Sequence, residues 1–200
     1  MWPMDSFVFI IFLLLCLALA LSVFRKGDHV LKIKLLRLFI VLLATAFFTY
    51  WFVQRSLPGF MKDSMVIQII NKLPQPVDFY VVKVKDAKAE GDPYVLRHSG
   101  KIRPEHYRTE YLKMNDSGEY WIAGYIGKKN MVYFSQHAVP NKNMDQIVEI
   151  KNYINQSMKL SETAGKIIEK YRKSDMQSSV WVTLCLLLIF LNSMLLATRK

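Results

Sequence analysis

The chain has 200 residues, is 52% hydrophobic and carries a formal net charge of +11. A basic excess of this size is typical of nucleic-acid binding, but seven of the 27 Lys and Arg residues flank long apolar runs, a placement typical of membrane anchoring. Both cysteines, Cys16 and Cys185, lie inside apolar runs, so the sequence excludes a disulfide and a thiolate metal ligand in the polar middle of the chain.

Three apolar runs predict three membrane-spanning helices. Residues 7–24 and 180–197 are 18 residues each, and a middle run covers about 35–53. A stretch of about 20 residues crosses a bilayer core of about 30 Å. A signal peptide is the alternative interpretation of the first run, because Ala18-Leu19-Ala20 resembles a cleavage site; however, the residues before the run include Asp5 and no basic residue.

The basic residues predict which side of the membrane each segment faces. The loop at 25–37 holds five of them and the C-terminal tail holds two, whereas the first six residues hold none. Cytoplasmic loops are enriched in Lys and Arg. We therefore expect a bacterial inner-membrane protein with its N-terminus outside, its C-terminus inside and its long polar segment in the periplasm. The residues that set this orientation are Arg25, Lys26, Lys32, Lys34 and Arg37.

These features divide the chain into four predicted parts. Residues 1–53 form an N-terminal transmembrane hairpin with a basic cytoplasmic loop, and residues 54–156 form an extracytoplasmic β domain. Residues 157–179 form a juxtamembrane helix, because apolar residues recur there at three- and four-residue spacing. Residues 180–200 supply the third span and a short cytoplasmic tail.

Short runs rich in β-branched and aromatic residues alternate with turn residues in the polar segment. They predict strands at 65–70, 77–84, 94–98, 106–114, 119–126 and 131–138. This pattern favours an antiparallel β-sandwich or barrel, and we expect the sandwich. Residues 146–151 fit either a seventh strand, which is favoured, or the start of a helix.

The stretch Asp116-Ser117-Gly118-Glu119-Tyr120-Trp121-Ile122 resembles the tyrosine corner of immunoglobulin-like domains. In that family the tyrosine begins a strand and its hydroxyl bonds to the upstream backbone. The resemblance implies a sandwich in which Tyr120 faces the core. Adjacent strand residues face opposite ways, so Trp121 would then face away from the core. Ile122 stands where the family has its disulfide cysteine.

Groups able to catalyse a reaction are scarce in the sequence. The apolar stretches 7–24, 38–53 and 180–197 contain no Asp, Glu, Lys, Arg or His. His98, His106 and His137 lack the spacing of a metal-ligand pair. No nucleophile, phosphate-binding or zinc-protease motif occurs. We therefore expect a protein that is not an enzyme and that needs neither a cofactor nor a metal.

Two groups of residues are candidates for contact with partners. His106, Arg108 and Glu110 alternate along one predicted strand, which gives either a polar patch for a partner or the solvated face of a sheet. The second group has the small-xxx-small spacing of packed membrane helices; its members are Ala18, Ser22, Ser193 and Ala197.

The predicted cytoplasmic parts are too short to fold, so any action must pass through helix contacts and the outer domain. We expect an accessory, structural or assembly subunit of a bacterial inner-membrane complex. Its partners would be other integral membrane proteins and the lipid bilayer, not nucleic acid, in a homo- or hetero-oligomer. The alternative is a periplasmic ligand-binding sensor or substrate-binding module that regulates a partner transporter.

Overall fold

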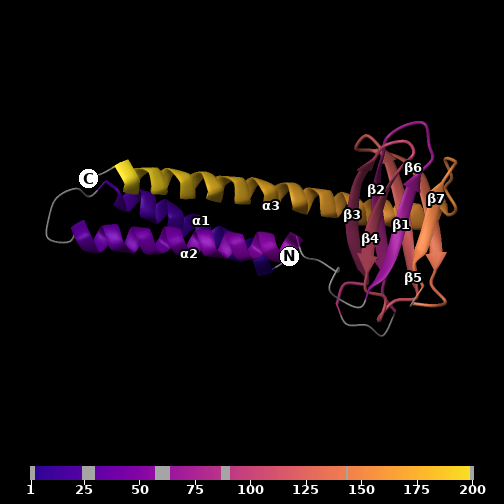
Figure 1. Ribbon diagram of the computed structural model, residues 1–200, viewed down its shortest axis with the longest axis horizontal. Coiled ribbons are helices and arrows are strands. Elements are labelled where there is room, and N and C mark those ends of the chain that lie inside the picture. Colours follow the sequence, from indigo (N-terminus) through magenta and orange to yellow (C-terminus); the bar gives the residue numbers. More distant parts are fainter. Residues whose placement is uncertain (1–2, 24–29, 57–63, 87–90, 143, 199–200) are drawn as a thin grey trace. The chain divides into compact units, whose positions relative to one another are not determined.

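The computed structural model describes residues 3–23, 30–56, 64–86, 91–142 and 144–198, which belong to two compact units (Figure 1). One unit is helical and comprises Met1–Ser56 together with Lys173–Lys200. The other unit, Leu57–Arg172, contains the strands and is called the β domain below.

The helical unit is built from α1 (Pro3–Leu21), α2 (Val30–Ser56) and the later part of α3 (Met158–Thr198). Among the described helices, only α3 is both long and apolar enough to cross a membrane by length and composition. The apolar part of α1, Phe7–Leu21, is shorter. The structure therefore supports one of the three expected spans.

The start of α2 corrects the expected basic loop. Where the sequence predicts a loop over 25–37, the helix already begins at Val30. The reason is that residues 30–37 are mainly Leu, Ile, Lys and Arg, without Gly or Pro to interrupt the helix. Lys32, Lys34 and Arg37 consequently lie in the first turns of α2, and the expected loop residues Arg25 and Lys26 lie outside the described residues.

The β domain contains two sheets, with strand orders β4-β1-β7 and β3-β2-β5-β6. Neighbouring strands are antiparallel except β1 and β7, which are parallel, so the first sheet is mixed instead of fully antiparallel. The favoured strand at 146–151 is confirmed. The strands are β1 (Met65–Asn71), β2 (Val77–Val84), β3 (Tyr94–Ile102), β4 (His106–Leu112), β5 (Glu119–Ile126), β6 (Asn130–Ala138) and β7 (Gln146–Ile150).

The main apolar core lies between the two sheets. Alternate residues of each strand point into it, as the two-residue period of a β-strand requires. Ile67 and Ile69 come from the first sheet, and Phe79, Val81 and Tyr120 come from the second; all five are fully buried. Removal of this apolar surface from water is the main stabilising contribution to the domain.

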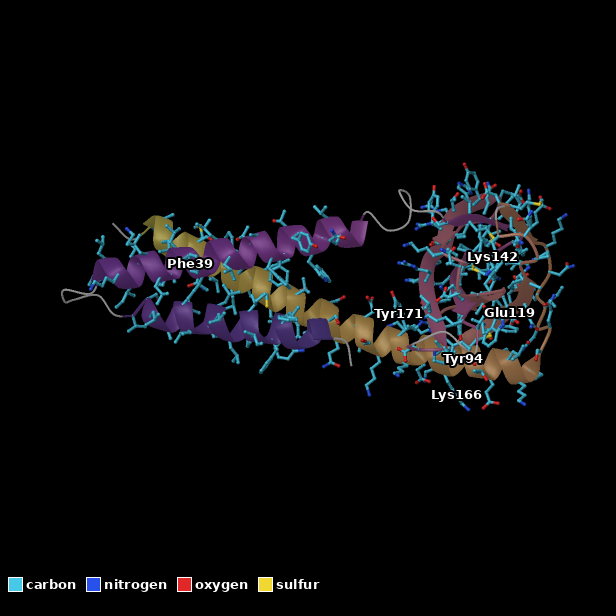
Figure 2. The ribbon with its side chains drawn as sticks, turned by 90° about the horizontal axis from the view of Figure 1, so that it is seen from below. Phe39, Tyr94, Glu119, Lys142, Lys166 and Tyr171 are labelled. Atoms are coloured by element: carbon cyan, nitrogen blue, oxygen red, sulfur yellow. The ribbon has the colours of Figure 1, made fainter. Side chains whose placement is uncertain are left out.

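A second apolar cluster forms where the first part of α3 covers the outer face of the second sheet. Trp121 and Phe134 on the sheet pack with Ala164 and Ile168 on the helix. Figure 2 shows this helix against the strands, with Lys166 on its exposed side. Trp121 faces away from the inter-sheet core, yet it is only 3% exposed because the helix covers it.

Candidate functional site

A group of polar side chains in the β domain joins the second sheet to α3. We call Asp78, Tyr80, His98, Tyr125 and Arg172 the helix-anchoring cluster. Asp78 accepts hydrogen bonds from the Tyr80 hydroxyl at 3.0 Å and from Nε2 of His98 at 2.7 Å, when that nitrogen carries the proton. Arg172 Nε donates to the Tyr80 hydroxyl at 2.9 Å.

Aromatic packing completes this cluster. The Tyr80 and His98 rings stack with centroids 4.4 Å apart and an interplanar angle of 10°. The Arg172 guanidinium carbon lies 4.9 Å from the Tyr80 ring centroid and 4.5 Å from the Tyr125 ring centroid, which are cation–π distances. Arg172 also donates to the backbone carbonyl of Lys128.

The surroundings shift the pKa values of two members of the cluster. Burial acts to raise the pKa of Asp78, but the hydrogen bonds from His98 and Tyr80 and the Arg172 charge together lower it below its ordinary value. Burial raises the pKa of Tyr80 to about 12, although the Arg172 hydrogen bond opposes this shift. The cluster therefore holds an ionised carboxylate, a neutral phenol and a guanidinium at neutral pH.

Sequence reasoning did not find this cluster, although one signal was present. Ala164, Ile168 and Arg172 follow each other at four-residue spacing, so Arg172 extends the apolar stripe of α3 that faces the sheet. The carboxylate, phenol, imidazole and guanidinium all bond within the group. This arrangement fixes the helix on the sheet.

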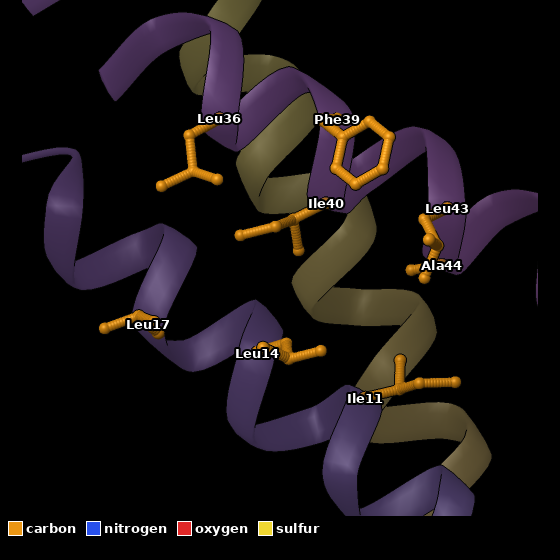
Figure 3. Close-up of a pocket in the computed structure, with 8 residues that line it drawn as sticks. All are labelled: Ile11, Leu14, Leu17, Leu36, Phe39, Ile40, Leu43 and Ala44. Atoms are coloured by element: carbon orange, nitrogen blue, oxygen red, sulfur yellow. The ribbon is translucent and has the colours of Figure 1, made fainter. Parts of the chain in front are cut away.

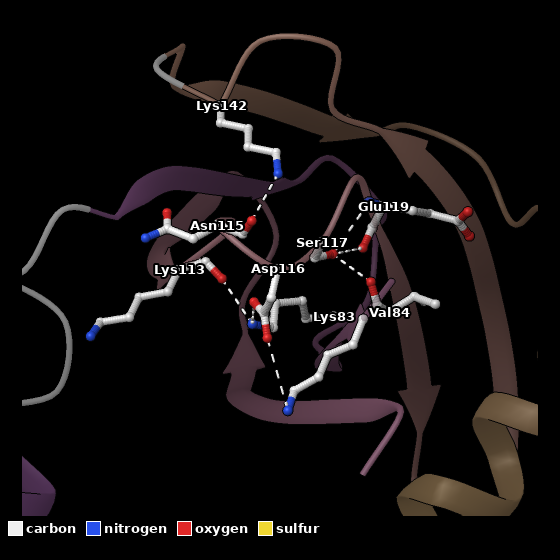
Figure 4. A network of polar contacts seen from close by, with 9 residues as sticks. Lys83, Val84, Lys113, Asn115, Asp116, Ser117, Glu119 and Lys142 are labelled. Atoms are coloured by element: carbon white, nitrogen blue, oxygen red, sulfur yellow. Dashed lines mark hydrogen bonds and ion pairs between the residues drawn. The ribbon is translucent and has the colours of Figure 1, made fainter. Parts of the chain in front are cut away.

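A second polar group organises the turn before β5 (Figure 4). Lys83 is 7% exposed, and its ammonium group donates to the Asp116 carboxylate at 2.6 Å and to the Lys113 carbonyl at 2.9 Å. The hydroxyl of Ser117 donates to the carbonyls of Val84 and Glu119. The hydrogen bond from Lys83 is the main cause of the lowered pKa of Asp116. These contacts satisfy a buried charge, which would be costly without a partner.

The turn differs from the tyrosine corner that its sequence resembles. Tyr120 faces the inter-sheet core, as the resemblance implies, but its hydroxyl donates to the side chain of Gln146 on β7 at 2.6 Å. Ser117 instead bonds to backbone carbonyls across the turn. In this turn a serine, and not the tyrosine, bonds to the backbone carbonyls.

His137 stacks on Tyr120 at the margin of the inter-sheet core. The ring centroids are 5.0 Å apart with an interplanar angle of 10°. The hydroxyl of Ser135 lies 2.7 Å from Nε2 of His137, a distance suitable for a serine activated by a histidine base. Ser135 is only 1% exposed, however, so a substrate cannot reach its hydroxyl in this arrangement.

The expected patch residues His106, Arg108 and Glu110 share one face of β4. They pair with Asn71, Ile69 and Ile67 of β1, and Ile67 and Ile69 point into the core. The patch is therefore on the side of β4 that faces the second sheet. Because β4 is an edge strand, the side chains of His106 and Arg108 are nevertheless exposed.

Arg108 extends toward the neighbouring sheet and meets the backbone of β3. A Cβ atom added to Gly100 would lie 3.4 Å from Nη1 of Arg108. Gly100 has a φ of +82° and follows Ser99 at an irregularity in the β2–β3 register. The buried hydroxyl of Ser99 has no hydrogen-bond partner among the described residues. This edge thus presents the exposed guanidinium of Arg108 close to Gly100.

The small residues expected at helix contacts are in two different environments. Ala18 on α1 and Ser22, just after the end of α1, are buried inside the helical unit, whereas Ser193 and Ala197 on α3 are exposed. Asn192, beside Ser193, is fully buried, and its amide donates to the carbonyl of Leu15 on α1 at 3.2 Å. The exposed face of α3 therefore lies beside, and not within, the contact with α1.

The three histidines of the β domain have separate partners. His98 bonds to Asp78, His106 to the carbonyl of Pro104, and His137 to Ser135. Among the described residues, no group of three His, Cys, Asp or Glu side chains is placed to hold a metal ion. No protein-family model, curated protein or solved structure matches this chain.

Proposed function

We propose that the helical unit lies in a bilayer and supplies three spans, one each from α1, α2 and α3. The observation that carries this proposal is the surface of the unit. Large apolar side chains are exposed on all three helices, including Phe7 at 56%, Phe39 at 62% and Phe190 at 59%. The unit also has an apolar core in which residues of all three helices pack together. Helices that are apolar on every side are stable in lipid, because in water this exposed surface would be costly.

The proposed orientation places the β domain in the periplasm of a bacterial inner membrane, with the N-terminus outside and the C-terminus inside. Its support is the basic sequence 25–37 between the first two apolar runs, together with the absence of Lys and Arg from the first six residues. Trp51 and Trp181 lie at the opposite ends of their apolar runs from these charges, where an indole favours the headgroup level.

Within this membrane setting, we propose an accessory, structural or assembly subunit of a membrane complex that acts without catalysis. Its support in the β domain is that the polar clusters around Lys83 and Arg172 make hydrogen bonds that hold the turn and the helix in place. Its support in the helical unit is the exposed small-residue face at Ser193 and Ala197, where a partner helix can approach closely.

A ligand-binding sensor or substrate-binding module for a partner transporter is the second candidate. The observation that favours it is the edge between β3 and β4, where the side chain of Arg108 is exposed close to Gly100. An exposed guanidinium suits an anionic ligand. This candidate predicts saturable binding of a small anion that Arg108→Gln removes.

Co-purification tests the subunit proposal. The tagged full-length protein is extracted from native membranes in mild detergent and examined on a native gel. We expect a stoichiometric complex that the double change Ser193→Leu and Ala197→Leu disperses, because bulky side chains keep a partner helix away. Ala46→Leu, an exposed small residue on α2, is the matched control and should leave the complex intact. A wild-type protein that migrates alone would contradict the subunit role.

A further inference from the structure

An apolar groove runs between α1 and α2 within the helical unit (Figure 3). It has a volume of about 290 Å³, and each residue lining it is hydrophobic. Along α2 it extends from Leu36 to Ala44, and along α1 from Leu17 to Ile11. Figure 3 shows Leu17 facing the Leu36 end of the groove and Ile11 near the Ala44 end.

The length and the lining of the groove suit a hydrocarbon chain. From Leu36 to Ala44 a helix rises about 12 Å, so the groove follows the helix axis for about that length. Its lining offers only hydrophobic side chains and no polar side chain that could orient a polar ligand. An extended acyl chain can lie along such a groove.

A positive charge lies on the same helix face as the groove. Lys32 precedes Leu36 by one turn, and Phe39 and Leu43 continue the same stripe at three- and four-residue spacing. The Lys32 side chain is exposed, and no described residue forms a hydrogen bond or ion pair with it. An ammonium group is thus available beyond the Leu36 end of the groove.

We propose that the groove binds one acyl chain of an anionic phospholipid, whose headgroup phosphate pairs with Lys32. The inference rests on the bilayer location proposed above for the helical unit. The apolar wall accepts the chain of any lipid, so the charge at Lys32 decides the preference among lipids. Basic residues at the cytoplasmic ends of membrane helices attract anionic headgroups in this way.

Native mass spectrometry of retained lipids tests the headgroup part. The full-length protein is reconstituted with equal amounts of phosphatidylglycerol and phosphatidylcholine and extracted in mild detergent. We expect one retained lipid, with about a fivefold preference for phosphatidylglycerol, the order expected of one lysine at an anionic surface. Lys32→Gln should bind both lipids equally. Lys34→Gln is the control, because two positions along a helix place it on the opposite side.

Tryptophan substitutions test the groove itself. Leu36→Trp should fill the groove and abolish retention of either lipid, whereas Leu38→Trp, on the opposite side of α2, should leave retention unchanged. Equal retention of the two lipids by the wild-type protein, or an unchanged preference in Lys32→Gln, would overturn the lipid site.

Carbonate extraction of the same membranes tests the bilayer location of the helical unit separately from the lipid site. A protein that resists extraction without lipid preference contradicts the lipid site alone, and a released protein contradicts the bilayer location as well.

Discussion

Tyr120 and His137 stack on each other from neighbouring strands at the margin of the inter-sheet core, and each also has a hydrogen-bonded partner. Tyr120 bonds to Gln146 on the other sheet, and His137 bonds to Ser135. Burial raises the pKa of Tyr120 and lowers the pKa of His137, so both side chains are held neutral. The hydrogen bond of Tyr120 and the lowered pKa of His137 each have a measurable consequence for stability.

We expect Tyr120→Phe to lower the free energy of unfolding by about 1 kcal/mol, because one hydrogen bond to Gln146 is lost. Tyr120→Ala should cost about 3–5 kcal/mol, because it also empties space in the core. Tyr107→Phe is the control, since Tyr107 is 61% exposed, and should change stability by less than about 0.5 kcal/mol. Urea denaturation of the detergent-solubilised chain, followed by near-UV circular dichroism, measures all three. Equal losses in the two phenylalanine variants would contradict the hydrogen bond.

The buried imidazole of His137 predicts a loss of stability in mild acid. An unfolded histidine has a pKa of about 6.5, and burial lowers the pKa of His137 in the folded domain. As the pH falls below about 6.5, the unfolded chain therefore gains a proton before the folded domain does, and the free energy of unfolding decreases. The lowered pKa of Asp78 adds a similar loss only at and below its ordinary value of 3.8.

Unfolding measured at intervals from pH 7.5 to pH 5 tests this expectation. The wild-type protein should lose stability across the range, and His137→Gln should lose less because it removes the titrating group. Parallel pH profiles for the two proteins would exclude His137 as the source of the loss.

The first part of α3, residues 158–172, packs on the second sheet of the β domain. It buries Ala164 and Ile168 against the sheet, and Arg172 at its end bonds to Tyr80 and lies against Tyr125. These contacts belong to the β domain and give the helix a fixed register on the sheet. This attachment depends on the planar guanidinium of Arg172, which can donate hydrogen bonds and stack on aromatic rings at the same time.

We expect Arg172→Ala to destabilise residues 158–172 by about 1–3 kcal/mol, because a charged hydrogen bond and two aromatic contacts are lost. Arg172→Lys should recover only part of this loss, since an ammonium group cannot stack as a guanidinium does. Lys170→Ala, at an exposed position on the same helix, is the control. Hydrogen exchange of the α3 amides gives the comparison. Equal protection in the Arg172→Ala and Lys170→Ala variants would show that the cluster does not anchor the helix.

The strands were predictable from the sequence because their signal is local. Alternation of apolar and polar residues with turn residues between them places each of the seven strands, including β7. The parallel pairing of β7 with β1 was not predictable, because it joins residues about 80 positions apart. The strand β3 runs beyond residue 98 to Ile102, because an irregularity near Ser99 carries it past Gly100.

The polar clusters were harder to predict for the same reason. Asp78, His98 and Arg172 come together only after β2, β3 and α3 have packed, so no short motif contains them. The expected patch at His106, Arg108 and Glu110 shares one face of β4, as alternation predicts. Alternation does not tell which face is inward, and that depends on the pairing of β4 with β1.

At the scale of the whole molecule, the chain combines a two-sheet β domain with a helical unit that has an apolar core and large exposed apolar side chains. The proposed function requires the helical unit to be in a bilayer and the β domain to be in the periplasm. Labelling of single cysteines tests both requirements together. Wild-type protein is the baseline, because Cys16 and Cys185 lie within apolar helices.

Lys101→Cys, at an exposed position of β3, is the direct probe of topology. We predict that a membrane-impermeant maleimide labels this cysteine in intact bacterial spheroplasts, because the proposed orientation places the β domain outside. Lys32→Cys, on the proposed cytoplasmic side, should be labelled only after lysis. Labelling of Lys101→Cys only after lysis, with Lys32→Cys accessible in intact spheroplasts, would contradict the proposed orientation and with it the periplasmic role of the β domain.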